Sequence, residues 1–361
     1  MTAAVYHGPH DVRIEQRPIP GRPAGYVLLR VLRSGICGTD GSEWRDGPHL
    51  FPSATPHPVT GVAGLFVLGH EFIGEVVEPD EAGTWAVGAR VACGAGVACG
   101  ECPRCLEGCT NLCYRYHTHG LNEDGGMAEY VAVPAGILAA IPDELTTDAA
   151  GLAQPLAVGI HAARRSGAVD GDRVVLIGAG AIGTFVLAGL LAQHDVEVTV
   201  VDFAGPRLER AERLGAAHTV GVGESTVDDV AAVVGGRGAD VVIEASGAPG
   251  QLANAIRMVR AGGTILQVGL PSRAAEIDLH PLVVREVTIR TTNAHVFADD
   301  LDPALALLAT SRLAEELLDS VRPLADLPEQ LELLATGRLE GKVLFDPALC
   351  VTHPQKRNGT E

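Results

Sequence analysis

Aromatic side chains are scarce in this chain, since Phe, Trp and Tyr make up only 4% of its 361 residues. A wide pocket lined by aromatic rings is therefore disfavoured. Long apolar runs are also lacking, because no stretch approaches the ~20 residues that a transmembrane helix needs. Nothing at the N-terminus resembles a secretory signal. We therefore expect a cytoplasmic protein with no membrane partner.

Basic residues are in the minority, with 27 Lys and Arg against 45 Asp and Glu and a net charge of −18. Such a charge balance disfavours nucleic acid and anionic lipid as partners. Hydrophobic residues make up 47% of the chain, which is typical of a globular protein rather than a disordered one. The length exceeds what a single core usually supports, so two domains are expected.

Cysteine is concentrated in one short segment, where Cys99, Cys102, Cys105 and Cys113 follow one another closely. Zn²⁺ prefers four ligands at the corners of a tetrahedron, and two-residue gaps let a tight loop aim successive sulfurs inward. Four thiolates leave no position for a substrate, so this pattern predicts a structural zinc site. The alternative is a pair of disulfides, which the reducing cytosol disfavours.

Further metal-ligand types lie upstream, in the motifs Gly-Ile-Cys-Gly-Thr-Asp and Gly-His-Glu. These motifs suit a zinc site that keeps one coordination position open, with Cys37 and His70 as ligands. Asp40 or Glu71 would be a further ligand or a carboxylate that orients the imidazole. A single buried Cys or His is more often an ordinary core residue. The glycines around both motifs favour a site, because they indicate backbone that turns sharply.

A glycine-rich turn follows the β-branched run 173–177 and precedes an apolar helix over 184–193. The glycines permit a tight turn and close approach of backbone N–H groups to a pyrophosphate, and the helix N-terminus favours its negative charge. The predicted cofactor-binding residues of this turn are Gly178, Gly180, Ala181, Ile182 and Gly183.

Asp202 ends the next predicted strand, near the position where an acid binds the ribose diol. An acid there repels a 2′-phosphate, so the sequence favours NAD over NADP. Arg207 follows shortly and keeps NADP possible. The alternative for Asp202 is an ordinary loop carboxylate.

The pattern of short segments changes along the chain. Up to about residue 150 no helical period dominates, and strands are expected over 3–6, 26–31, 74–77, 90–92 and 127–133. From about residue 170, strands and helices alternate as in a parallel sheet. The expected strands are 174–177, 196–201, 218–220, 241–244, 264–268 and 287–290, and the helices between them include 206–214 and 251–259. The remainder predicts helices over 303–308 and 327–335 and a strand over 343–345, which returns to the first lobe.

These motifs, in this order and together with Asp-Gly-Gly-Met-Ala-Glu-Tyr at 124–130, resemble the zinc-containing medium-chain dehydrogenase/reductases over residues 1–347. The stretch between Cys37 and His70 is similar to the 2,3-butanediol and polyol dehydrogenase branch. The resemblance implies an α/β chain with a GroES-like, β-rich catalytic domain carrying the structural zinc lobe, a Rossmann domain with a doubly wound parallel sheet, and a C-terminal segment. We expect these over 1–153, 154–294 and 295–361. The resemblance also implies a homodimer or homotetramer.

The resemblance makes Cys37 and His70 ligands of a catalytic zinc, with Glu71 as an adjacent or alternating ligand. Where many polyol-oxidising members carry a further Glu, this chain has Gln154. An amide oxygen can still bind zinc but leaves the site one negative charge poorer, which lowers the pKa of a bound alcohol further. The alternative is that Gln154 only caps a helix or binds water.

The implied reaction transfers a hydride from a secondary alcohol to NAD(P), with zinc lowering the pKa of the alcohol and Thr39 passing on its proton. Where many relatives have a His in the proton path, this chain has Ser42. Water, Ser42, Glu43 and His49 all remain open as the exit.

The loops near Trp44, His49, His119 and 293–295 are polar, which favours a polyol, cyclitol, sugar or vicinal diol as substrate. Two other functions remain open: a zinc-independent alkene or quinone reductase of the same superfamily, and a catalytically inactive nucleotide-binding homologue.

Overall fold

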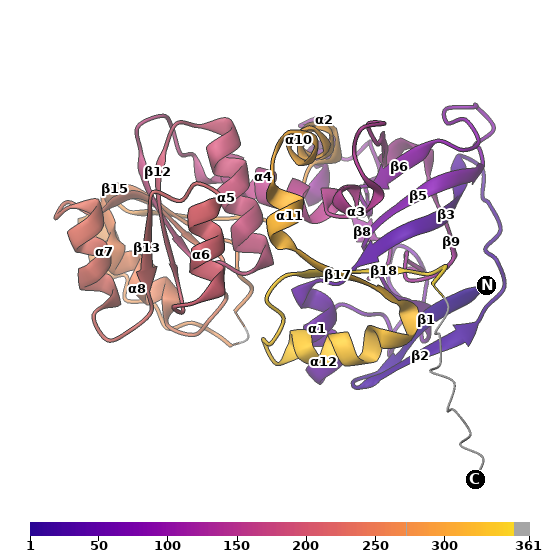
Figure 1. Cartoon of the computed structure of the whole chain (residues 1–361), viewed down its shortest axis with the longest axis horizontal. Helices are drawn as coiled ribbons and strands as arrows, with labels where there is room; N and C mark the ends of the chain where they lie inside the picture. The colour runs from indigo at the N-terminus through magenta and orange to yellow at the C-terminus, as the bar shows by residue number, and fades with distance from the viewer. Residues whose placement is uncertain (272, 350–361) are drawn as a thin grey trace, which may run out of the picture.

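The computed structural model describes residues 1–271 and 273–349, which form two lobes side by side (Figure 1). One lobe contains mainly antiparallel sheets, built from the N-terminal half and two C-terminal strands, and the other contains a parallel sheet flanked by helices. The last residues of the segment 295–361 lie outside the described part of the chain. No described helix combines the length and the apolar character needed to cross a membrane.

The largest sheet of the first lobe is built around β3 (Tyr26–Gly35), which pairs antiparallel with β5 (Glu71–Glu78), β9 (Tyr130–Pro134) and β18 (Lys342–Asp346). Alternate residues of β3 are buried in one core with Phe72 and Val133, which is the period-two pattern of a strand. The remaining strands of this sheet are β6 (Arg90–Cys93), β10 (Leu138–Ala140) and β17 (Leu318–Pro323).

Two smaller sheets complete this lobe. One contains β1 (Thr2–Gly8), β2 (Asp11–Gln16) and β4 (Phe66–Val67), and the other pairs β7 (Gly96–Val97) with β8 (His117–Thr118). Short helices between the strands are α1 (Gly38–Asp46), α2 (Pro103–Leu106), η1 (Thr110–Leu112), η2 (Ala135–Ile137) and α3 (Thr147–Ala150).

The second lobe is a six-stranded parallel sheet in the order β13-β12-β11-β14-β15-β16. Val174 and Leu176 of its central strand β11 face one hydrophobic core, while Val175 and Ile177 face another. Burial on both faces is what a parallel sheet covered by helices requires. The strands are β11 (Arg173–Ile177), β12 (Glu197–Asp202), β13 (His218–Gly221), β14 (Ala239–Glu244), β15 (Val259–Gln267) and β16 (Thr288–Thr291).

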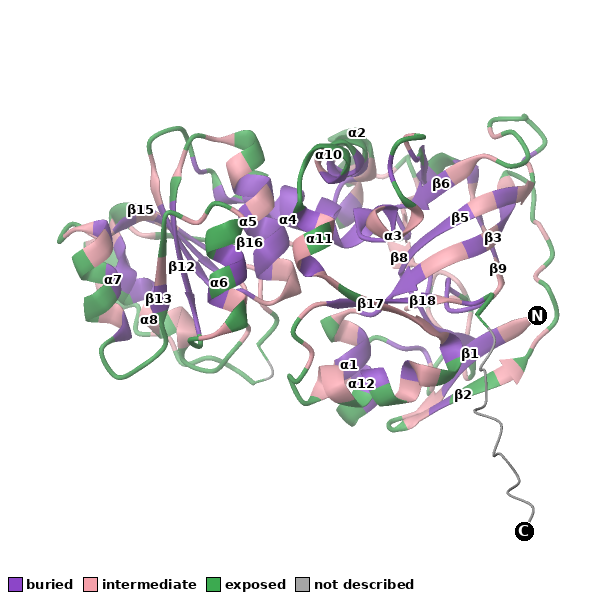
Figure 2. Cartoon of the chain, viewed as in Figure 1, coloured by how far each residue is buried: buried purple, intermediate pink, exposed green. Residues whose placement is uncertain are grey.

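The helices of this lobe connect successive strands. They are α5 (Ala181–Gln193), α6 (Pro206–Arg213), α7 (Thr226–Val234), α8 (Gln251–Met258) and α9 (His280–Val284). The helix that leads into the sheet, α4 (Ala153–Ser166), lies between the two lobes and is buried along most of its length (Figure 2).

After β16 the chain forms α10 (Phe297–Thr310), α11 (Leu313–Leu317), η3 (Leu324–Asp326) and α12 (Leu327–Ala335) around the strands β17 and β18. β18 inserts between β17 and β3, with Leu344 opposite Gly35. The end of the described chain therefore completes the sheet of the first lobe.

Although no helical period dominates residues 1–150, the structure contains a helix there, α1, which carries Thr39. Its sequence has two glycines and no apolar period, so hydrophobic patterning gives no signal. The helix begins instead with a capping interaction, in which Asp40 Oδ2 accepts a hydrogen bond from the Cys37 N–H at 2.9 Å. Other boundaries move by a few residues, and the largest shift is at α10, which begins at Phe297 rather than at 303.

Candidate active site and metal centres

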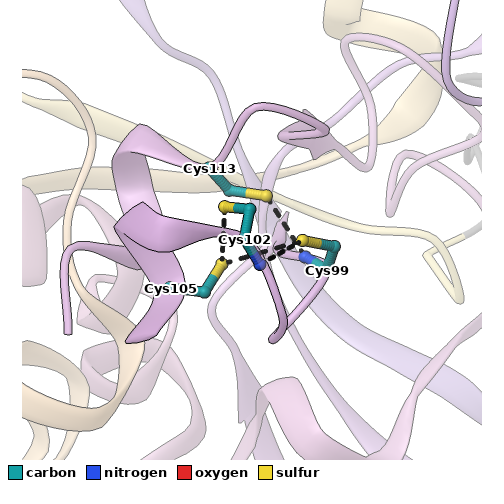
Figure 3. Close-up of side chains that lie close together, drawn as sticks. All are labelled: Cys99, Cys102, Cys105 and Cys113. Atoms are coloured by element: carbon teal, nitrogen blue, oxygen red, sulfur yellow. Dashed lines mark hydrogen bonds between the residues drawn. The ribbon is translucent and has the colours of Figure 1, made fainter. Parts of the chain in front are cut away.

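The four clustered cysteines lie together on one loop, with their sulfurs facing a common centre (Figure 3). The Sγ atoms of Cys99 and Cys105 are 4.0 Å apart, and those of Cys102 and Cys105 are 3.5 Å apart. Tetrahedral zinc with Zn–S bonds of about 2.3 Å places its sulfurs about 3.8 Å apart. Every cysteine within residues 1–349 is free, so this part of the chain contains no disulfide bond.

Backbone amides surround these sulfurs. The Cys99 N–H donates to Cys113 Sγ at 3.2 Å, and the Cys102 N–H donates to Cys99 Sγ at 3.4 Å. Hydrogen bonds from the backbone lower the pKa of Cys99 and bring that of Cys102 down to about 6. Cys99 and Cys102 are thus favoured as thiolates, the form that binds metal, whereas desolvation raises the pKa of Cys105 to about 12 in the absence of a metal. The close spacing of the four sulfurs is what fits a structural zinc ion.

A second ligand cluster forms where the end of β3 lies beside the start of β5. The ligand atoms of Cys37, His70 and Glu71 all lie within 4.8 Å of one another. The pairing of Gly35 with Glu71 brings the two motifs together, although they are far apart in the sequence. A side chain at Gly69, whose φ is +100°, would place its Cβ 2.7 Å from the Met127 nitrogen, so glycine is required for this close approach.

Asp40 lies behind the imidazole of His70. Its Oδ1 is 3.7 Å from His70 Nδ1, and these two buried atoms have no hydrogen-bond partner. Burial alone would lower the pKa of His70, but the charges of Asp40 and Cys37 raise it to about 9. The pocket thus favours positive charge at this position, and the donor set of sulfur, nitrogen and oxygen fits zinc.

Sequence reasoning missed one residue of this cluster, Lys342 of β18. Its Nζ contacts Glu71 Oε2 and donates to the backbone oxygen of Ile36, and both charged side chains are buried. Because the two residues are 271 positions apart in the sequence, no local pattern signals the pair. Lys342 neutralises Glu71 when Glu71 binds no metal.

A cleft of about 160 Å³ connects this cluster to the second lobe. The first lobe contributes Cys37, Glu71 and Lys342. The second lobe contributes Gly180, Ala181 and Ile182 of the glycine-rich turn and Arg207 of α6. Two predicted sites that are distant in the sequence therefore line one cleft.

The glycine-rich turn lies between β11 and α5, which begins at Ala181, slightly earlier than expected. Gly178 has a φ of +100°, and its Cβ would lie 2.9 Å from the Ser246 nitrogen. Gly183 packs so closely on the Gly178 oxygen that no Cβ fits there. These are the tight turn and the close helix–strand packing of a dinucleotide-binding turn.

Asp202 is buried at the end of β12, where its Oδ2 accepts a hydrogen bond of 2.6 Å from the Ala179 N–H. Arg207 lines the cleft, and its Nε is 3.1 Å from Glu340 Oε2 of the C-terminal segment. The guanidinium of Arg207 is thus paired with a carboxylate of the C-terminal segment.

The residues considered for the path of the alcohol proton make other contacts in the structure. Both carboxylate oxygens of Glu43 accept hydrogen bonds from the His49 N–H, and one of them also accepts from the Leu50 N–H, so Glu43 holds a loop. The imidazole of His49 is exposed and lies 3.0 Å from Asp46. Ser42 donates to the Gly38 oxygen at 3.2 Å, and Thr39 is half-buried in the first turn of α1.

The predicted substrate-binding side chains largely make contacts within the fold. The Trp44 indole N–H donates to Glu332 at 2.8 Å, and His295 Nε2 is 3.0 Å from the Gly94 oxygen. His119 lines a separate cavity of about 480 Å³. Gln154 is buried in the first turn of α4.

A cysteine–histidine–carboxylate cluster that faces a dinucleotide-binding turn defines a zinc- and dinucleotide-dependent oxidoreductase. Comparison with known proteins identifies the family. Residues 23–143 match the alcohol dehydrogenase GroES-like domain, and residues 181–310 match the zinc-binding dehydrogenase family.

Two curated relatives cover nearly the whole chain. (R,R)-butanediol dehydrogenase of Bacillus subtilis is 34% identical over 96% of this chain and 100% of the relative. Erythritol/L-threitol dehydrogenase of Mycolicibacterium smegmatis is 30% identical over 96% of this chain and 98% of the relative.

Two crystal structures share the fold. The structure of 2R,3R-butanediol dehydrogenase from Bacillus subtilis has a TM-score of 0.87 at 32% identity, covering 96% of this chain and 99% of that one. An Escherichia coli alcohol dehydrogenase complexed with NADH has a TM-score of 0.84 at 25% identity, with the same coverage.

The chain belongs to the zinc-containing alcohol dehydrogenase family of medium-chain dehydrogenases. It is an NAD(P)-dependent oxidoreductase that acts on CH–OH groups, with zinc at a Cys₄ cluster and at a Cys/His/Glu site. The predictions of the family, the α/β fold class with its GroES-like and Rossmann lobes, and the cofactors are confirmed.

Proposed function

We propose that this enzyme oxidises a vicinal diol or another polyhydroxylated secondary alcohol with NAD. The observation that carries the proposal is that two members of the Cys37–His70–Glu71 cluster, Cys37 and Glu71, line the cleft that the dinucleotide turn also lines. The choice of a hydroxyl-rich substrate is supported by relatives named for butanediol and for erythritol and threitol, each at least 30% identical.

In this proposal Cys37, His70 and Glu71 hold the catalytic zinc, with Gln154 as a further ligand. When bound, zinc stabilises the developing negative charge of the alcohol oxygen. Asp40 places a carboxylate oxygen 3.7 Å from His70 Nδ1, where its negative charge favours a metal-bound imidazole. When Glu71 is not bound to the metal, Lys342 balances its charge and holds the carboxylate beside β18.

The other steps use the chain's own groups. The Thr39 hydroxyl, in the first turn of α1, accepts the proton of the alcohol and passes it on. With Glu43 engaged by backbone amides, this proton leaves through water or along Ser42. The turn at Gly178, Gly180, Ala181, Ile182 and Gly183 binds the pyrophosphate and so positions the nicotinamide for hydride transfer.

We assign Asp202 to the ribose diol and therefore a preference for NAD over NADP. The engagement of Arg207 by Glu340 supports this preference, because a guanidinium paired with a carboxylate is less available to a 2′-phosphate.

We further propose the domain limits 1–153, 154–294 and 295–361, and a homodimer or homotetramer in solution. β16 is an edge strand of the parallel sheet, with all its residues exposed. Exposed apolar side chains lie on it and on the preceding α9, including Val283, Val284 and Ile289. An unpaired edge beside an apolar patch suits pairing with a second copy, which light scattering after gel filtration tests.

A panel of diols, linear polyols, cyclitols, sugars and simple secondary alcohols tests the substrate proposal, with NADH and NADPH formation followed by absorbance. The proposal expects the highest kcat/KM among the vicinal diols and polyols, with NAD. Zinc counting on the same sample should give two ions per chain. A preference for simple aliphatic alcohols would reject the substrate class, and a single zinc would reject the mechanism.

A further inference from the structure

One buried amide joins the structural zinc loop to the cofactor-binding lobe. Asn111 lies between Cys109 and Cys113 and is only 6% exposed. Its Nδ2 donates to the backbone oxygen of Asn293 at 2.8 Å and lies 3.3 Å from His161 Nε2. A side-chain amide nitrogen carries two hydrogens, so both are used by the opposite lobe.

The imidazole of His161 accepts one of these bonds in a fixed direction. Burial and the neighbouring Arg164 lower the pKa of His161 to about 4, so the ring is neutral near pH 7. Its Nδ1 is 3.1 Å from Asp300 Oδ2, and an ionised carboxylate can only accept. The proton is therefore on Nδ1, and the Nε2 lone pair faces Asn111.

The segment held by Asn111 is the loop 293–295, which follows β16. In open parallel sheets the dinucleotide binds beyond the carboxyl ends of the strands, where this loop lies. Ala294 has a φ of +49°, a left-handed conformation that a residue other than glycine keeps only when its surroundings impose it. His295 Nε2 bonds to the Gly94 oxygen of the first lobe, so the loop is fixed on both sides of Ala294.

We propose that Asn111 is a positioning residue of this dehydrogenase, which holds the loop 293–295 against the structural zinc loop and thereby sets the affinity for the nicotinamide cofactor. The inference rests on the proposed binding of the cofactor at this edge of the sheet. The structural zinc loop then acts as a rigid wall of the cofactor site in addition to stabilising the first lobe.

The substitution Asn111→Asp tests this role with almost no change of shape. It replaces two donated hydrogens by an acceptor that faces the Asn293 oxygen and the lone pair of His161. We expect the Kd for NADH, measured by fluorescence titration, to rise about fivefold or more, with a parallel rise in KM for NAD and a smaller change in kcat. Zinc should remain at two ions per chain.

Leu112→Ala is the matched control, because Leu112 lies in the same short turn and is 49% exposed. Its NADH affinity should not change. A second variant, His161→Ala, removes the acceptor without touching the zinc loop and should raise the Kd about twofold to threefold. This variant carries the test if Asn111→Asp does not fold.

Unchanged NADH affinity in a zinc-replete Asn111→Asp protein would overturn the inference, and so would unchanged affinity in His161→Ala. Loss of the structural zinc from Asn111→Asp would overturn it as well, because Asn111 would then serve only the zinc loop. NADH binding is measured without alcohol, so an incorrect substrate assignment does not affect the outcome.

Discussion

Replacing Asp40 by Asn should weaken catalytic zinc binding while leaving the shape of the site intact. Asp40 has two tasks: its Oδ2 accepts the Cys37 N–H at 2.9 Å, and its Oδ1 faces His70 Nδ1 at 3.7 Å. The amide oxygen of Asn keeps the first contact. Burial raises the pKa of Asp40, while the facing His70 and the Cys37 N–H oppose this shift. The substitution removes only the negative charge that the carboxylate places behind the imidazole.

The size of the effect follows from that distance. A unit charge 3.7 Å from a full positive charge contributes about 4.5 kcal/mol at an effective dielectric constant of about 20. A zinc-bound imidazole carries only part of a charge, so we expect a 10–100-fold loss of zinc affinity, about 1.4–2.8 kcal/mol. Competition with a chromophoric chelator measures the weaker of the two zinc ions, and activity should fall in step with its loss.

Asp46→Asn is the matched control, because Asp46 lies on the same helix and its carboxylate is exposed beside His49. That variant should retain both zinc ions and full activity. Equal zinc affinity in Asp40→Asn and the parent protein would refute the role given to Asp40.

Three further predictions concern other parts of the chain. Cys102→Ser should contain one zinc ion instead of two and unfold at lower denaturant, because a structural zinc contributes folding free energy; an unchanged midpoint would contradict this. Asp202→Ala should raise kcat/KM with NADP relative to NAD about tenfold, as the repelling carboxylate is removed, and an unchanged ratio would reject the ribose assignment. The pKa values of His161 and His295 are lowered by burial to about 4, so the unfolded chain binds more protons between pH 6.5 and 4. Stability should therefore fall as the pH drops through this window, by about 3 kcal/mol per group at its lower end, and denaturation at pH 7 and pH 4.5 measures the loss.

The functional residues that could be predicted from the sequence are those whose role is indicated by their spacing within one short segment. The cysteine loop and the turn at Gly178 are each built from one short segment, so the chemistry of neighbouring residues predicts their geometry. The turn also constrains its neighbours, because close backbone packing requires glycine there. Such sites can be predicted before the fold is known.

The contacts that sequence reasoning missed join distant segments. Lys342 meets Glu71 only because β18 inserts beside β3, and Asn111 meets Asn293 only because the two lobes come together. The helix α1 was missed for a different reason, since its stability comes from capping and from packing on α12 rather than from an apolar period. Pairing partners across the fold depend on topology, which residue spacing alone does not define.

The insertion of β18 has a consequence for the order of events during synthesis. The strands of the parallel sheet, 173–291, are contiguous in the chain and can assemble as soon as they leave the ribosome. The N-terminal sheet, although made first, must wait for residues 342–346 to fill the place beside β3. Until residues 342–346 have been made, Glu71 lacks Lys342 as its partner, and the incomplete sheet presents an unpaired part of the β3 edge to other chains.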